Sequence, residues 1–249
     1  MNDYEGNNSY KLNGEDMLLD SDPYQKSSNP IFGAIAGSSV MTASFGFMFL
    51  ALLISFGTAW TVSVQFQNNF ETIYALLLPC VVFELITVFV ASRSLSKGNV
   101  LVGSIAFLLY SVLNGATLSI IFFAYQLPSI GLVFLVAAFM FGGCALFGAI
   151  TKIDLSPMAG FIMVSLIGMI VLGVFAVIFH LEQVSIFLCI FGVLLFAGIT
   201  AYDVQKIKML SRMHTGMSVL ALGMLGGLTL YLDFINLFLR LLRLFGRRK

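Results

Sequence analysis

Residues 98–151 read GNVLVGSIAFLLYSVLNGATLSIIFFAYQLPSIGLVFLVAAFMFGGCALFGAIT and contain no Asp, Glu, Lys or Arg. A membrane-spanning helix needs about 20 mostly apolar residues, so this stretch has room for two spans. The alternation with period two that marks strands is absent, and an open sheet would leave backbone groups unpaired in lipid. The stretch therefore predicts a helical membrane protein.

The rest of the chain agrees with this prediction. Hydrophobic residues make up 59% of the sequence, charged residues 10%, and the mean hydropathy of +0.99 lies outside the range of soluble domains. We expect an all-α, multi-pass protein whose main partner is the lipid bilayer and which binds no nucleic acid. The seven predicted spans are residues 35–56, 73–91, 100–125, 131–150, 158–179, 185–207 and 220–242.

The N-terminal segment has a different composition. Residues 1–30 combine six acidic side chains with Asn, Ser and Gly and lack a long apolar run. Such a segment cannot bury enough apolar surface to fold, so we predict a disordered acidic tail, 1–30, followed by a transmembrane domain, 31–249. It also lacks the basic start and short apolar core of a secretory signal.

Basic residues in the short loops predict the orientation. The loops after the second, fourth and sixth spans carry Lys or Arg, whereas residues 57–72, 126–130 and 180–184 carry neither. Cytoplasmic loops are enriched in Lys and Arg, which places the N-terminus in the cytoplasm. The basic C-terminus disagrees, since seven spans would export it; it contains Arg240, Arg243, Arg247, Arg248 and Lys249. We expect the last helix to cross the membrane rather than re-enter it.

A few polar side chains fall at membrane depth. Ionised groups in hydrocarbon are costly, so they usually face a protein interior or a watery cavity and bind, sense or move something. The simplest interpretation of each asparagine is an interhelical hydrogen bond, and that of Asp203 is an interfacial residue balanced by Lys206. The set comprises Glu84, Asn114, Asp203, Asp233, Asn236 and Arg240, the last three on one helical face.

Depth constrains the two aspartates. If the sixth span ends five residues after Asp203, this residue lies about 7 Å from the membrane edge, whereas Asp233 counted from Leu220 lies about 20 Å in. Glycine pairs weaken helices, and residues 226–227 are such a pair. We therefore expect the helix to restart there, which would bring Asp233 to about 9 Å, level with Asp203.

The motifs around these residues resemble the Bax inhibitor-1 family in its bacterial form. The resemblance rests on YDVQKIK at 202–208, LYLDFINLF at 230–238 with LLR at 241–243, FE at 83–84 and YSVLNG at 110–115. It covers the membrane region but not the acidic tail. It implies a seven-helix fold with the last helix surrounded by the others, in a bacterial inner membrane.

The resemblance also implies a pH-sensitive calcium leak. In that picture Asp203 and Asp233 form a proton-sharing dyad, Glu84 lines the pore, and an arginine at the end of the second helix latches onto the dyad. Arg93 is the matching residue, although its spacing from Glu84 is slightly shorter than the family pattern. Calcium is then the permeant ion, contacted weakly by the three acids, and no cofactor is tightly bound.

The chemistry of paired carboxylates supports this interpretation independently. Two carboxylates in contact cannot both ionise cheaply, so they share a proton and respond to pH. Calcium prefers several oxygen ligands, and two or three acids suit passage better than storage. A leak needs no energy source, and the sequence has no Gly-rich nucleotide loop ending in Gly-Lys-Ser or Gly-Lys-Thr.

Two other function classes stay open. A presenilin-like intramembrane protease would also place one aspartate after Tyr in the sixth span, but Asp233 follows Tyr-Leu instead of Gly-x-Gly, and Pro-Ala-Leu is absent. We therefore expect no enzyme. A non-conducting regulator that binds a membrane protease or a stress or survival partner is the remaining alternative.

The predicted orientation can be tested with reporter fusions. A reporter fused after Lys97 should be cytoplasmic, because the loop after the second span is basic. A reporter inserted within residues 57–72 should be external, because that loop has no Lys or Arg. The reverse pattern of reporter activity would overturn the orientation.

Overall fold

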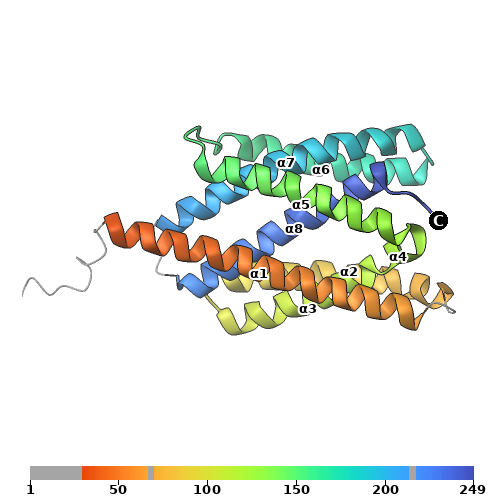
Figure 1. Cartoon of the computed structure of the whole chain (residues 1–249), viewed down its shortest axis with the longest axis horizontal. Coiled ribbons are helices and arrows are strands. Elements are labelled where there is room, and N and C mark those ends of the chain that lie inside the picture. The colour runs from red at the N-terminus through yellow and green to blue at the C-terminus, as the bar shows by residue number, and fades with distance from the viewer. Residues whose placement is uncertain (1–29, 67–69, 213–216) are drawn as a thin grey trace, which may run out of the picture.

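The computed structural model describes residues 30–66, 70–212 and 217–249, which form eight α-helices (Figure 1). The predicted acidic tail lies outside these residues except for Pro30. The helices are α1 (Pro30–Gln65), α2 (Phe70–Ser96), α3 (Val100–Leu118), α4 (Ile120–Ala124), α5 (Leu127–Ile150), α6 (Met158–Ile178), α7 (Glu182–Arg212) and α8 (Val219–Phe245).

The prediction of seven spans is confirmed within the described part of the chain. Seven segments are long and apolar enough to cross a membrane. The third predicted span is one apolar segment, Val100–Ala124, in which Ser119, itself in a helical conformation, lies between α3 and α4. Several helices extend beyond the predicted bounds, because a helix continues past the apolar stretch that sequence hydropathy detects.

The last helix is central, as the resemblance implies. Helix α8 packs against α1, α2, α3, α5 and α7, and Figure 1 shows it running obliquely between the α1–α3 and α5–α7 groups. In its apolar segment 67% of the residues are buried in the protein, against 11% for α6. Helix α6 packs on α7 at the periphery. The ring around α8 is therefore formed without a major contribution from α6.

The expected helix break at residues 226–227 is wrong. Helix α8 is continuous from Val219 to Phe245. The two glycines instead allow α1 to approach: a Cβ at Gly226 would lie 2.3 Å from Ser44 Oγ, and one at Gly227 would lie 2.7 Å from Phe47 Cβ. Membrane helices gain little from hydrophobic burial against each other, so such small residues at close contacts stabilise their packing.

The two aspartates reach a common level by other means. Helix α7 continues to Arg212, which places Asp203 about 13 Å from its end. Asp233 lies about 21 Å along α8 from Val219, but α8 is oblique in the bundle (Figure 1) and advances less than 1.5 Å per residue across it. The tilt of α8 and the length of α7 thus replace the break expected from the sequence.

The C-terminal residues support a last helix that crosses the bundle. The backbone N–H of Gln126 donates to Arg247 O (3.0 Å), and that of Lys249 donates to Ala124 O (3.1 Å). These bonds attach the tail to the α4–α5 connection, one of the loops without Lys or Arg. Helix α8 therefore begins beside the basic end of α7 and finishes at the opposite end of the bundle.

The close contact at Gly226 predicts a stability effect. Gly226→Ala should lower the melting temperature in detergent, with an overpacking cost of about 1–3 kcal/mol, because the added methyl group meets Ser44 of α1. Gly142→Ala on α5 is the matched control, since a Cβ there meets nothing within 4 Å. An unchanged melting temperature for Gly226→Ala would show that this contact does not need glycine.

Candidate functional site

The carboxyl groups of Asp203 on α7 and Asp233 on α8 lie within hydrogen-bonding reach of each other. Asp233 is only 5% exposed, whereas Asp203 is partly exposed. The Oδ2 atom of Asp233 is buried and has no hydrogen-bond partner among the described residues. A buried acceptor without a partner is unfavourable. The pair is thus a polar centre inside an otherwise apolar bundle.

Helix geometry explains why Asp233 faces α7. Residues two positions apart in an α-helix differ by about 200° around its axis, so Asp233 and Tyr231 lie on opposite faces of α8. Tyr231 contacts α1 and α3, which leaves Asp233 on the side of α7. Its neighbour Phe234 is buried as well, and it packs edge to face with Phe141 of α5. The aspartate is therefore held by the apolar packing of its own helix.

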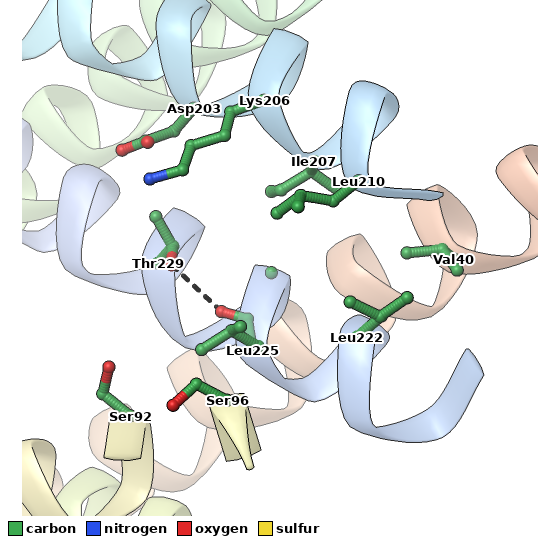
Figure 2. A pocket seen from close by; sticks show the side chains of 11 residues that line it. Val40, Ser92, Ser96, Asp203, Lys206, Ile207, Leu210, Leu222, Leu225 and Thr229 are labelled. Atoms are coloured by element: carbon green, nitrogen blue, oxygen red, sulfur yellow. Dashed lines mark hydrogen bonds between the residues drawn. The ribbon is translucent and has the colours of Figure 1, made fainter. Parts of the chain in front are cut away.

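A cavity of about 230 Å³ adjoins Asp203, but not Asp233, and is lined by α1, α2, α7 and α8. Figure 2 shows Asp203 and Lys206 extending from α7 on one side of it, with Ser92 and Ser96 of α2 opposite. Thr229 of α8 adds a third hydroxyl. The other lining residues are Val40, Ile207, Leu210, Leu222, Leu225 and Gly226. The cavity reaches Asp203 from the end of the bundle where the basic loops lie.

Lys206 is the charged neighbour of the pair. It lies one helical turn after Asp203 and is close enough for its positive charge to act on that carboxyl group. Its ammonium group also lies 5.8 Å from the centre of the Tyr202 ring. Asp203 is thus near both Lys206 and Asp233, and no ion pair joins Lys206 to Asp203 in the part of the chain that the structure describes.

Glu84 lies elsewhere in the bundle. It is 9% exposed, accepts a hydrogen bond from Thr117 Oγ1 (2.6 Å), and is also bonded by the side chain of Asn114. Both donors are neutral and belong to α3. Glu84 does not line the cavity beside Asp203. The structure thus provides two separate acidic centres, one on each side of α8.

The second centre continues through hydroxyl groups. Tyr231 donates to Asn114 Oδ1 (2.8 Å), and its oxygen lies 2.6 Å from Ser55 Oγ on α1. The predicted interhelical hydrogen bond of Asn114 is confirmed. The same prediction for Asn236 is wrong, because its side chain donates to Leu232 O (2.8 Å) within α8.

Sequence reasoning missed Ser55 and Thr117. Each is a small polar residue in an apolar helix, a pattern that is frequent in membrane proteins and has no specific meaning alone. Tyr231 stands in the motif at 230–238, but its hydroxyl gave no signal of a partner. Only the packing of α1, α3 and α8 identifies these three side chains.

The two arginines do not contact the aspartate pair. Arg93 is exposed, forms no ion pair with any residue that the structure describes, and does not line the cavity, where its neighbour Ser92 lies. Its latch role remains a prediction. Arg240 lies about 10 Å beyond Asp233 along α8, beside Gly192 of α7.

Comparisons with known proteins place the chain in a family. The family model described as "Inhibitor of apoptosis-promoting Bax1" matches residues 37–249. The inner membrane protein YbhL of Escherichia coli K12 is 36% identical over 214 residues, which cover 84% of this chain and 92% of that protein. An uncharacterized protein of Borreliella burgdorferi is 35% identical over 214 residues, covering 82% and 90%. An uncharacterized membrane protein of Streptococcus pyogenes serotype M1 is 38% identical over 166 residues, covering 67% and 72%.

None of these names is that of an enzyme. The seven spans and the relatives together identify a multi-pass inner membrane protein. The match to the family model extends over the whole transmembrane region, including both acidic centres. The chain belongs to the Bax inhibitor-1 family.

Proposed function

We propose that this protein is a pH-sensitive calcium leak channel of the Bax inhibitor-1 type, in which Asp203 and Asp233 share a proton. The observation that supports the proposal is the contact between the two carboxyl groups in a buried position next to a cavity. Calcium and protons are then its ligands, calcium as the permeant ion and not as a tightly bound cofactor. The protein acts as a channel and not as an enzyme.

The pH response follows from the charges of the pair. With one shared proton, Asp203 and Asp233 attract each other and hold α7 against α8. When the pH rises and the proton leaves, two negative charges face each other at short range, and their repulsion favours separation of the helices. The contact is therefore stable at lower pH and is lost as the pH rises.

The cavity has suitable groups for a passing cation. Calcium is bound by six to eight oxygen atoms, and the cavity presents one carboxylate and the hydroxyls of Ser92, Ser96 and Thr229. These are too few for tight binding, so an entering ion would also leave. Lys206 lies in the same space and competes with calcium for Asp203.

Glu84 supplies a second negative charge on the route. It stands eight residues before Ser92 on α2, about 12 Å further across the membrane. A carboxylate in a pore attracts cations. Entry beside Asp203 and passage near Glu84 would thus follow the side of α2 that packs on α3 and α8.

The two alternatives make different demands on the same residues. A membrane regulator would bind its partner, such as a membrane protease, without ion flux. An intramembrane protease would use the aspartate pair to cleave a peptide. Calcium flux into liposomes that contain only the purified protein, measured over a pH series, supports the channel if it occurs and excludes it if it does not.

The aspartate pair predicts non-additive mutations. Asp203→Asn and Asp233→Asn should each abolish or strongly shift the pH dependence of calcium flux, because one carboxyl group cannot share a proton with an amide in the same way. The double variant should resemble the single ones. Asp154→Asn, in the exposed loop before α6, is the control and should leave the profile unchanged. Additive shifts would contradict a shared proton.

Glu84 predicts an effect on conductance. Glu84→Gln should lower calcium flux several-fold at every pH while the protein stays folded, since the amide keeps an acceptor for Thr117 but removes the negative charge. Flux in liposomes and the elution profile in detergent measure the two properties. Glu182→Gln, an exposed acid at the start of α7, serves as control. Unchanged flux would reduce Glu84 to a packing role.

A further inference from the structure

A chain of hydrogen bonds joins four helices on the side of α8 away from the aspartate pair. It runs from Ser55 on α1 through Tyr231 on α8 and Asn114 on α3 to Glu84 on α2. Tyr231 is completely buried, and Ser55 and Asn114 are buried too. No other side chain of α8 that the structure describes makes side-chain hydrogen bonds to two other helices. Tyr231 is therefore the polar connection between the central helix and its neighbours.

The number of hydroxyl hydrogens gives this chain a direction. Ser55 and Tyr231 have one hydrogen each, but three contacts draw on them: Ser55 with Ser111 O (2.7 Å), Ser55 with Tyr231 (2.6 Å) and Tyr231 with Asn114 Oδ1 (2.8 Å). When the NH₂ group of Asn114 faces Glu84, its Oδ1 accepts from Tyr231. Tyr231 then has no second hydrogen, so only Ser55 can donate in the Ser55–Tyr231 contact, and its one hydrogen is divided between Tyr231 and Ser111 O. Removal of the Tyr231 hydroxyl thus disconnects α8 from both α1 and α3.

The position of Tyr231 on α8 relates this chain to the aspartates. Tyr231 and Asp233 lie on opposite faces of one rigid helix. At a radius of about 5 Å, a rotation of α8 by about 20° moves the end of a side chain by about 2 Å. A rotation that moves Asp233 away from Asp203 therefore also breaks hydrogen bonds of 2.6–2.8 Å at Tyr231.

We propose that Tyr231 is a positioning residue, whose hydroxyl holds α8 in the rotation that places Asp233 against Asp203 and at the same time orients Asn114 toward Glu84. This inference rests on the proposed channel function for its effect on flux, but not for its effect on the position of α8. The titratable groups that act on Tyr231 are Tyr110 of α3 and Glu84 of α2, and α1 contributes the neutral Ser55.

Tyr231→Phe tests the proposal with a minimal change. The ring keeps its edge-to-face contacts with Phe107 and Tyr110, at centroid distances of 6.3 and 5.7 Å, and only the hydroxyl is lost. Because the hydroxyl contacts of α8 with Ser55 and Asn114 are both lost, the midpoint of the flux-versus-pH profile should move to lower pH by about half a unit or more. A change in general stability alone would not move this midpoint.

The position of α8 can be measured without ion flux. Nitroxide labels at Leu101→Cys on α3 and Leu220→Cys on α8, both exposed, would report their separation by pulsed electron paramagnetic resonance in a background without the native cysteines. Tyr231→Phe should broaden or shift the distance distribution relative to the unsubstituted background. An unchanged distance distribution overturns the proposal, and this result is valid even if the protein conducts no ions.

Tyr110→Phe is the matched control. Tyr110 is as large and is 5% exposed, packs against the Tyr231 ring, and its hydroxyl is not part of the chain. It should leave both the pH midpoint and the distance distribution unchanged. Equal effects of the two Phe variants would show that packing and not the hydrogen bonds positions α8, and would overturn the proposal.

Ser55→Ala provides a second route to the same answer. It removes the donor to Tyr231 from the α1 side, so it should shift the midpoint and the distances in the same direction as Tyr231→Phe. The double variant should shift by less than the sum of the two single variants, because both lose the Ser55–Tyr231 contact, while the bond from Ser55 to Ser111 O is lost with Ser55 alone. If Tyr231→Phe does not fold, the test rests on Ser55→Ala. A wild-type pH midpoint and distance distribution in Ser55→Ala would then overturn the proposal. Absence of flux in the wild type would overturn the channel function only.

Discussion

The cost of an ionisable side chain in hydrocarbon is the constraint on which this structure depends. Asp233 meets it by lying in the middle of α8, the most enclosed of the seven spans, with α7 beside it. An apolar helix in lipid has no such requirement, and α6 accordingly lies at the periphery with most of its surface exposed. The arrangement of the bundle is therefore in large part an arrangement around α8.

Helix α8 separates two polar centres that use different chemistry. On one face Asp233 meets Asp203, a like group, and in the proposed function their contact depends on a shared proton. On the other face Tyr231 joins Ser55 and Asn114 by neutral hydrogen bonds, which do not depend on a proton in the same way. If the first contact depends on pH as proposed, the second one, made by neutral groups, keeps α8 connected to α1 and α3 while the first responds.

The sequence predicted the fold well because hydropathy determines it directly. The uncharged residues 98–151 required two spans, and the structure has α3 with α4, and α5, in that stretch. Asp203, Asp233 and Glu84 were also found from sequence, since carboxylates in apolar helices are rare. The role of Gly226 could not be predicted from the sequence, because a glycine in a helix looks the same in sequence whether it permits a break or a close contact. Ser55 and Thr117 acquire their meaning only from helices distant in sequence.

The close contact of α1 and α8 has a consequence for how the bundle could open. Where not even a methyl group fits between Gly226 and Ser44, neither an acyl chain nor a file of water can enter. At this contact α8 would then stay against α1 during any movement of the bundle. A gap would form more easily along α2 and α7, which line the existing cavity beside α8.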